Sequence, residues 1–305
     1  MRRAKERTKK KKWPWIVGLI ALPLLAIGIY VAMVYSSFST AIDEMHEPIA
    51  REKSEKREEQ VTLTEQDPFS VLLLGVDERE GDSGRSDTMV VMTVNPKDQS
   101  TKMVSIPRDT YTEIIGRGTM DKINHAYAFG GIEMSMATTE NLLDIPIDYV
   151  VQVNMDGFKD IVDAVGGVDV ENAAAFDNFS TGNIHLNGDD ALSYVRMRKQ
   201  DARGDFGRQD RQKQVLQAVI REGASANSLM NYNDIFNALG TNVRTNMTFD
   251  EMKDVQKNYR EAAGTVDQMI VQDGYGETIN GVWYYMMNDA ELAEIQQTLK
   301  SHLES

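Results

Sequence analysis

The sequence predicts an α/β fold, in which a mixed central β-sheet is flanked by helices, and one transmembrane helix that precedes it. Two observations predict the sheet domain. Short apolar runs of the buried-strand type recur along the chain, and segments with helical apolar spacing lie between them. A third observation predicts the membrane helix, because residues 13–35 are almost wholly apolar and carry no charge. The composition, 41% hydrophobic and 26% charged over 305 residues, is that of a globular protein with a substantial core.

The chain begins with a basic tip, residues 1–12, which holds eight Lys or Arg residues and one acidic residue. As a helix, residues 13–35 would be roughly 30 Å long or slightly more, which matches the hydrocarbon core of a bilayer. Trp13 and Tyr35 stand at its two ends, where aromatic side chains are enriched in membrane helices. A basic N-terminal flank predicts that this flank stays in the cytoplasm. We therefore expect a single-pass type II protein of the cell membrane with an extracellular C-terminal domain.

A cleaved signal peptide is the alternative for this region, because Ser37, Ser39 and Ala41 are small. The apolar stretch is longer than that of a signal peptide, which favours an uncleaved anchor. Residues 36–67 mix acidic and basic side chains and hold few apolar ones. We interpret them as an extracellular linker, partly helical, that holds the domain away from the membrane. Residues 68–305 are expected to form the extracellular domain.

Several classes of site are absent from the sequence. There is no cysteine, which excludes disulfides, thiolate metal sites and cysteine nucleophiles. The four histidines have no zinc-type spacing, and neither a Gly-x-Ser-x-Gly motif nor a Walker phosphate loop is present. The formal net charge of −14 argues against a nucleic acid as partner.

The elements of the domain follow from its apolar periodicity. We expect strands at residues 69–76, 87–94, 102–106, 149–153, 266–272 and 282–287. We expect helices at residues 135–143, 157–165, 208–224, 248–259 and 290–299. The fourth of these helices starts at Thr248 with Glu251 three residues later, which is the pattern of a capping box.

Two aspartates mark the ends of the first two strands. Asp77 follows the first strand and Asp87 begins the second. If these strands pair as antiparallel neighbours, both carboxylates lie at one edge of the sheet. Two carboxylates with open positions suit Mg²⁺, or Mn²⁺, which binds carboxylates together with water and phosphate oxygens. The loop between them carries Arg79 and Arg85, and the alternative interpretation is a surface loop rich in turn residues.

Residues 194–212 form an arginine-rich segment. Its basic residues are Arg196, Arg198, Lys199, Arg203, Arg208 and Arg211. A guanidinium group binds two phosphate oxygens at once and keeps its charge. Arg208 and Arg211 would lie in the first turn of a helix, where free N–H groups also favour an anion. The alternative is a solvated helix start held by ion pairs, because three aspartates are close by in the sequence.

Arg108 follows the third expected strand, at the kind of strand end where ligand sites of α/β sheets collect. A purely structural pair between Arg108 and Asp109 is the alternative. Lys122 and Asn124 follow a glycine-containing loop and could line the same cleft.

Seven segments occur in order between residues 69 and 224: GVDER, RSDT, SIPRDT, DKINHAYAFGG, GFKDIVDAVGGVDV, LNGDDALSYVRMRK and DFGRQDRQ. This series resembles the motifs of the LytR-CpsA-Psr family of Gram-positive cell-envelope proteins, and residues 69–224 form the motif-bearing core of the domain. The basic tip and the single anchor fit the family as well. The length and the C-terminal third are most similar to Bacillus-type members that attach wall teichoic acid to peptidoglycan.

The resemblance implies a phosphotransferase that moves an anionic glycopolymer from a polyisoprenyl-pyrophosphate carrier to a peptidoglycan sugar hydroxyl. In the family pattern, the aspartates that match Asp77 and Asp87 hold Mg²⁺ on the pyrophosphate, and the prenyl chain enters an apolar pocket between sheet and helices. The arginines that match its pyrophosphate clamp are Arg85, Arg108, Arg196, Arg198 and Arg208. Further candidates for substrate contact are Arg79, Lys122, Asn124, Asp205, Arg211 and Gln212. Two alternatives stay open: a hydrolase that cleaves a lipid pyrophosphate with water, and a non-catalytic regulator of the envelope.

Overall fold

A computed structural model describes residues 45–305 except 52, 78–83, 198–199, 202–203 and 224–241. All described residues belong to one compact unit. Among the described residues, none of the helices combines the length and the apolar character needed to cross a bilayer. The basic tip and the expected membrane helix, residues 13–35, lie outside the described residues.

A six-stranded sheet in the order β10-β3-β2-β1-β6-β9 forms the centre of the domain. Its strands are β1 (Phe69–Val76), β2 (Ser86–Asn95), β3 (Ser100–Ser105), β6 (Tyr149–Asn154), β9 (Val243–Thr245) and β10 (Val266–Met269). The pairs β1–β2, β2–β3 and β6–β9 are antiparallel, whereas β1–β6 and β10–β3 are parallel. The predicted mixed sheet is therefore confirmed, and the long apolar runs of the sequence form its central strands.

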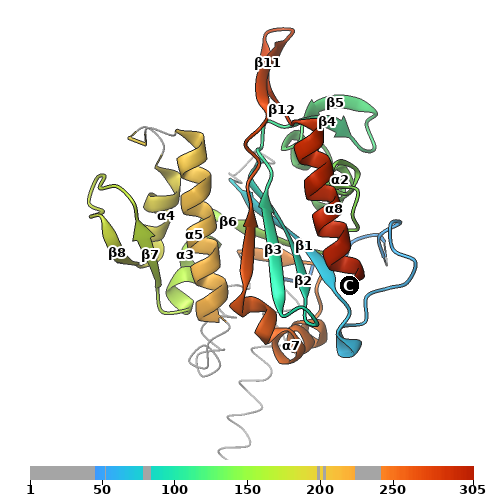
Figure 1. Ribbon diagram of the computed structural model, residues 1–305, viewed down its shortest axis with the longest axis horizontal. Coiled ribbons are helices and arrows are strands. Elements are labelled where there is room, and N and C mark those ends of the chain that lie inside the picture. The colour runs from blue at the N-terminus through green and yellow to red at the C-terminus, as the bar shows by residue number, and fades with distance from the viewer. Residues whose placement is uncertain (1–44, 52, 78–83, 198–199, 202–203, 224–241) are drawn as a thin grey trace, which may run out of the picture. The chain divides into compact units, whose positions relative to one another are not determined.

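One face of the sheet is covered by α2 (His125–Leu143) and α8 (Asp289–Glu304) (Figure 1). Alternate residues of β1, such as Leu72 and Leu74, point into the core on this side and are fully buried. Helix α2 begins ten residues before the predicted start, because Gly130 and Gly131 interrupt its pattern. The backbone there is non-helical, with φ of +61° at Gly131, so the two halves of α2 meet at a kink that glycine accommodates.

A second layer holds α3 (Met155–Ala164), α4 (Gly188–Arg196), α5 (Asp205–Gly223) and the hairpin of β7 (Val168–Asn172) and β8 (Gly182–Leu186). These elements share a core of their own, in which Tyr194 and Leu186 are almost fully buried. Figure 1 shows this layer on the side of the sheet away from α2 and α8. A third apolar cluster lies around α7 (Phe249–Asn258), η1 (Leu63–Glu65) and η2 (Arg260–Gly264). The capping box of Thr248 and Glu251 at the start of α7 is confirmed.

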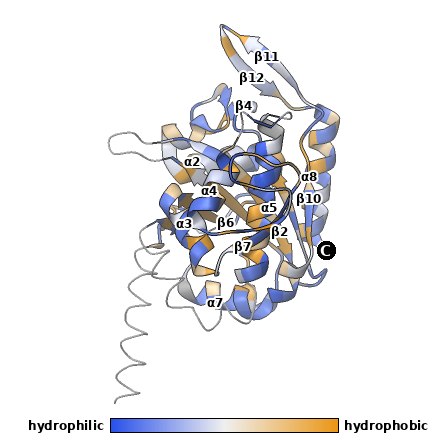
Figure 2. Cartoon of the chain, turned by 90° about the vertical axis from the view of Figure 1, so that its left-hand side faces the viewer, coloured by the Kyte–Doolittle hydropathy of each residue, from blue (hydrophilic) through white to orange (hydrophobic). Residues whose placement is uncertain are grey.

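Two further hairpins stand at one end of the sheet, β4 (Tyr111–Ile114) with β5 (Thr119–Lys122) and β11 (Tyr275–Ile279) with β12 (Val282–Met286). Of these four strands, only β12 was predicted. The β11–β12 hairpin projects beyond the helices and carries several apolar residues (Figure 2). Its turn, Asn280-Gly281, has positive φ at both residues, as a two-residue turn between twisted strands requires. The Asn-Gly pair was the signal for this hairpin in the sequence.

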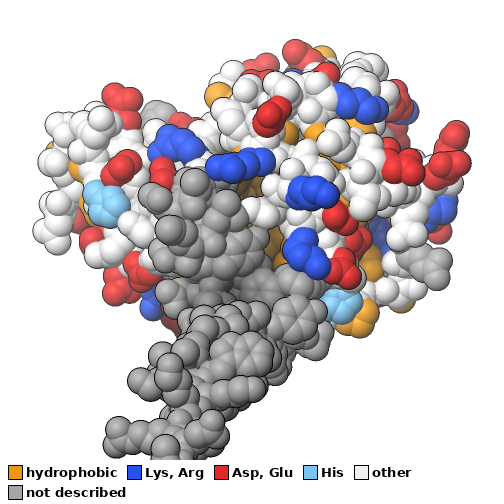
Figure 3. Space-filling view, turned by 90° about the horizontal axis from the view of Figure 1, so that it is seen from below, with side chains coloured by type: hydrophobic (Ala, Val, Ile, Leu, Met, Phe, Trp, Pro, Cys, Tyr) orange, Lys and Arg blue, Asp and Glu red, His pale blue; other side chains and the backbone are white. Residues whose placement is uncertain are grey.

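The part of the charged linker that the structure describes does not form a stalk. Residues 45–51 and 53–67, here called the strap, pack along the domain and extend its core. Arg51 pairs with Glu140 at 2.5 Å, and Arg57 makes two hydrogen bonds to the buried carboxylate of Asp148, at 2.9 and 2.7 Å. On the face seen from below, Lys and Arg side chains lie among Asp and Glu side chains (Figure 3). The predicted stalk is wrong for these residues, because its charges find partners some 90 positions away along the chain.

Candidate active site

Two aspartates lie at one edge of the central sheet. Val76, the last residue of β1, pairs with Ser86, but the residue before it pairs with Thr88. Asp87 is therefore the extra residue of a β-bulge, a feature that bends a strand and redirects its side chain. Asp77 follows Val76 directly, so the antiparallel pairing places both aspartates at the same edge, as the sequence led us to expect.

A row of alternating charges begins at Asp87. The Arg108 side chain donates from Nη1 to Asp87 Oδ1 at 2.7 Å, and its Nε lies 3.6 Å from Asp109 Oδ2. Lys122 at the end of β5 donates from Nζ to the other oxygen of Asp109, at 2.6 Å. The Arg108 side chain is 31% exposed and the Lys122 side chain is 18% exposed, so an anion from solvent can reach both cations.

Helix α5 completes this edge of the site. A small pocket is lined by Asp87, Thr88, Met89, Ser105, Ile106, Arg108, Arg208, Gln209 and Gln212. Arg208 and Gln212 are four residues apart and hence lie on one face of α5. The pocket thus brings together four predicted residues from β2, the segment after β3, and the first turns of α5.

Arg211 occupies a different position from the one we predicted. Its side chain is buried, and its guanidinium donates to the carbonyl oxygens of Tyr194 and Met197 and, at 2.6 Å, to the Asp201 carboxylate. A Cβ atom at Gly207 would collide with that carboxylate, so glycine is needed where Asp201 meets α5. In the described structure Arg211 binds α5 to the end of α4, and we infer that its role is structural.

Four further predicted residues do not line the pocket. Asn124 is buried and donates its main-chain N–H to the Arg108 carbonyl oxygen at 3.2 Å. Arg85 is exposed just before β2, Arg196 is the exposed last residue of α4, and Asp205 is the first residue of α5. Two predicted residues lie outside the described part of the chain: Arg79 and Arg198.

Sequence reasoning missed two charged residues, one in this row of charges and one on α5. Asp109 joins Arg108 to Lys122, although the sequence suggested only a local pair between Arg108 and its neighbour. Lys213, on the next turn of α5 after Gln209, is 2% exposed, and burial lowers the pKa of its ammonium group while Asp210 opposes that shift. A lysine inside an apolar helical repeat was its only signal.

The oxygen donors at the sheet edge are compatible with a magnesium ion. Asp77 and Asp87 supply two carboxylates, and the hydroxyl of Ser86 beside them is buried without a hydrogen-bond partner among the described residues. Within the described residues, no group of three or more His, Cys, Asp or Glu side chains could hold a metal. An ion held here would need water or substrate oxygens as further ligands, which is the habit of Mg²⁺ at phosphate sites.

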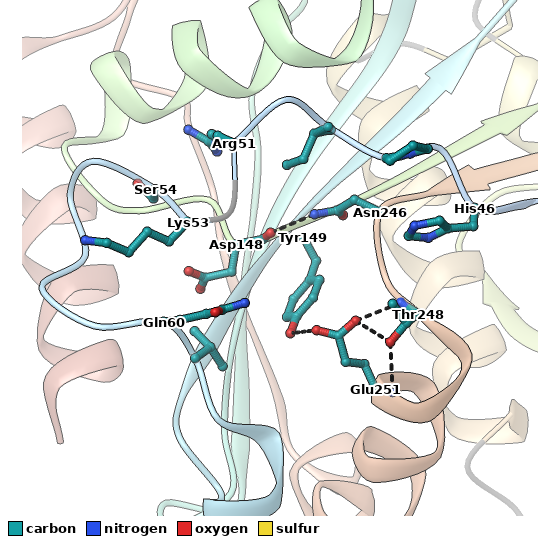
Figure 4. A pocket seen from close by; sticks show the side chains of 13 residues that line it. His46, Arg51, Lys53, Ser54, Gln60, Asp148, Tyr149, Asn246, Thr248 and Glu251 are labelled. Carbon is teal, nitrogen blue, oxygen red and sulfur yellow. Dashed lines mark hydrogen bonds between the residues drawn. The ribbon is translucent and has the colours of Figure 1, made fainter.

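A second pocket, of about 230 Å³, lies between the strap and α7 (Figure 4). None of the predicted site residues lines it. Its polar groups bind one another: Tyr149 donates its hydroxyl to Glu251 at 2.8 Å, and Asn246 donates to the Asp148 carbonyl oxygen at 3.0 Å. Burial, together with the Glu251 carboxylate, raises the pKa of Tyr149. We interpret this pocket as a structural feature where the strap packs against α7.

The architecture and this site define a member of a known family. The family model of LytR_cpsA_psr matches residues 31–301, and the chain belongs to the LytR_cpsA_psr family.

Two kinds of relative resemble the chain over most of its length. It is 51% identical over 300 residues to the polyisoprenyl-teichoic acid–peptidoglycan teichoic acid transferase TagU of Bacillus mycoides, with 97% of this chain and 99% of that protein covered. The crystal structure of B. subtilis TagU superposes with a TM-score of 0.63 at 49% identity, covering 78% of this chain and 98% of that one. A structure of TagT bound to LIIa-WTA has a TM-score of 0.74 at 34% identity, covering 85% and 100%.

Proposed function

We propose that this protein is a phosphotransferase that moves wall teichoic acid from a polyisoprenyl-pyrophosphate carrier to a sugar hydroxyl of peptidoglycan, where it forms a phosphodiester. Relatives about half identical over nearly the whole chain bear the name of this activity. The observation that carries the proposal is the meeting of Asp87, Arg108 and Arg208 in one pocket at the edge of the sheet.

The residues of the pocket suit a pyrophosphate. Arg108 is held toward the pocket by Asp87, and its planar guanidinium can exchange one carboxylate oxygen for a phosphate oxygen without moving far. Arg208 approaches from the first turn of α5, where the helix dipole also favours an anion. Asp109 and Lys122 form the other side of the row and hold Arg108 in place.

The transfer reaction has three parts. The acceptor hydroxyl oxygen attacks the phosphorus that carries the polymer, the bond from that phosphorus to the bridging oxygen breaks, and a polyisoprenyl monophosphate leaves. Negative charge grows on the leaving phosphate, and fixed cations such as Arg108 and Arg208 stabilise it because they need no reorganisation. One of the two aspartates at the sheet edge is a candidate to accept the proton of the acceptor hydroxyl.

We include a divalent cation in the proposal, held by Asp77 and Asp87. When bound, Mg²⁺ or Mn²⁺ would neutralise charge on the pyrophosphate oxygens. We also propose that residues 13–35 anchor the domain in the cell membrane as a single-pass type II protein, which would keep this site beside its lipid-linked substrate.

The proposal is tested with purified full-length protein in detergent, a polyisoprenyl-pyrophosphate-linked teichoic acid precursor and glycan oligomers of peptidoglycan. We expect polymer joined to glycan by phosphodiester, and Arg108→Ala should slow its formation by about 30- to 1000-fold. Arg221→Ala, on an exposed arginine near the end of α5, is the matched control and should retain the rate. Free polymer released in the presence of abundant acceptor would instead identify a hydrolase. Unchanged product formation by Arg108→Ala would remove the site from the reaction.

A further inference from the structure

The β11–β12 hairpin has two different faces. Residues paired across the strands share a face, and alternate residues along each strand return to it. Tyr275 and Tyr284 therefore share one face, whereas Trp283 lies on the other. A Cβ atom at Gly276 would lie 2.5 Å from the indole nitrogen of Trp283, so this ring lies against the strand on that second face.

The face with Tyr275 and Tyr284 continues onto the neighbouring hairpin. The rings of Tyr284 and Tyr111 of β4 meet edge to face, with centroids 4.9 Å apart and an interplanar angle of 64°. Tyr275 is 60% exposed, and Tyr111 and Tyr284 are partly exposed. We call these three residues the tyrosine face. Such rings offer rigid, flat apolar surfaces with a polar hydroxyl, and they lose little conformational entropy when a ligand binds.

The tyrosine face is connected to the candidate active site through its root. The Tyr285 main-chain N–H donates to the Asp109 carbonyl oxygen at 2.9 Å, and a β-bridge joins Thr110 to Tyr285. Lys122, which binds the Asp109 carboxylate, has its ammonium group 5.8 Å from the centre of the Tyr284 ring. A molecule lying on the tyrosine face would therefore end beside Arg108, the neighbour of Asp109.

The charge of the hairpin indicates which class of molecule the tyrosine face binds. Residues 270–287 contain two acidic residues, Asp273 and Glu277, and no Lys or Arg. A surface of this kind does not attract a polyanionic polymer or an anionic lipid headgroup, each of which is bound through basic side chains. An uncharged sugar chain fits it better, because pyranose rings stack their C–H faces on aromatic rings while their hydroxyl and amide groups bind the tyrosine hydroxyls.

We propose that the tyrosine face binds the acceptor, the acetamido-sugar backbone of peptidoglycan, and directs one of its hydroxyl groups toward Arg108. This inference rests on the proposed transferase function and extends it by giving the acceptor a place on the protein. The donor is bound by the arginines at the sheet edge, and the acceptor enters along the β11–β12 hairpin.

The test measures transfer by the full-length protein at saturating donor and varied concentration of uncrosslinked peptidoglycan glycan oligomers. Tyr275→Leu and Tyr284→Leu should each raise the half-saturating oligomer concentration about tenfold, with kcat within about twofold. Tyr284→Phe keeps the ring but loses the hydroxyl, so its half-saturating concentration should rise less than that of Tyr284→Leu. Trp283→Leu changes a large exposed side chain on the opposite face and is the matched control, for which we expect no change. Thermal melts compare the folding of all four variants.

Each other outcome overturns the inference in a recognisable way. Unchanged half-saturation in both leucine variants, with active wild type, rejects the tyrosine face and leaves the transferase intact. An equal rise in Trp283→Leu shows that the hairpin acts through its folding and not through this face. A defect seen only in proteoliposomes, and only in the dependence on donor, assigns the face to lipid. If the wild type transfers to no glycan oligomer at all, the transferase function fails and the acceptor role fails with it.

Discussion

The sequence and the structure lead to different roles for Arg211. The sequence makes it a candidate phosphate ligand, whereas the structure shows its side chain buried between α4 and α5. The decisive change is Arg211→Ala. It removes hydrogen bonds to the Tyr194 and Met197 carbonyl oxygens and the ion pair with Asp201, whose side chain is 11% exposed. It also removes a cation above the ring of Phe176, at 5.3 Å.

The expected cost follows from burial, since Arg211 is 6% exposed. Breaking a buried ion pair by removing one partner costs about 3–5 kcal/mol of unfolding free energy, and this figure already includes part of the cost of the orphaned carbonyls. For a domain of this size each kcal/mol corresponds to roughly 2–4 °C, so we expect the melting temperature to fall by about 10 °C. Arg211→Lys should recover little, because one ammonium cannot reach two carbonyls and a carboxylate in fixed directions.

The assay combines thermal melts with transfer rates measured well below the melting temperature. Arg108→Ala is the comparison, because its ion pairs are partly solvent-exposed and pairs of that kind contribute about 0–1 kcal/mol. We expect Arg211→Ala to melt early yet keep transfer within about tenfold, and Arg108→Ala to melt normally and lose about 30-fold or more. The reverse pattern, an Arg211→Ala protein of wild-type stability that has lost transfer, would refute the structural assignment.

Four further outcomes are expected. Arg208→Ala should lower the transfer rate by about 30- to 1000-fold and Arg208→Lys should rescue it poorly, because a point charge cannot replace a bidentate fork; equal rates in both variants and the wild type would contradict the clamp. Asp87→Ala should fold normally and lose turnover, chelation should have the same effect on the wild type, and added Mg²⁺ should restore only the chelated wild type; activity of the variant in chelator would exclude the metal. Burial lowers the pKa of His302, so its folded-state pKa lies below the unfolded value of 6.5; unfolding midpoints should fall as the pH drops through and below that value, and a His302→Gln protein with the same acid dependence would rule this histidine out. Protease added to intact protoplasts should remove the domain beyond about Ser36 and spare the basic tip, whereas a protected domain would reverse the topology.

The sequence predicted the features that depend only on residues near one another in the chain. The apolar runs that form β1, β2, β3 and β6 are long enough to be buried on both faces, and the structure places them at the centre of the sheet. The antiparallel neighbours β1 and β2 are joined by one loop, so the shared edge of Asp77 and Asp87 followed from their order alone. The capping box of α7 is likewise a pattern within four residues.

The contacts between distant segments could not be read from periodicity. Short strands such as β9, three residues long, carry too few residues to show an alternating pattern, and β10 pairs in parallel with β3 from more than 160 positions away. The hairpins β4–β5 and β11–β12 are local, but their strands are only four and five residues long, and they were missed as pairs although the Asn-Gly turn of the second was visible.

The difference between sequence and tertiary structure is clearest for the charged residues. A run of arginines looks the same in the sequence whether a side chain faces a pocket or the core. On α5, Arg208 lines the pocket beside Asp87, and Arg211, less than one turn later, is buried against α4. The strap gives a second example. Arg57 belongs to a charge run that we expected to be solvated, but it binds the buried carboxylate of Asp148. The charge and hydrogen-bonding capacity of a side chain are properties of the residue, whereas its burial and its partners depend on which surfaces the folded chain brings against it.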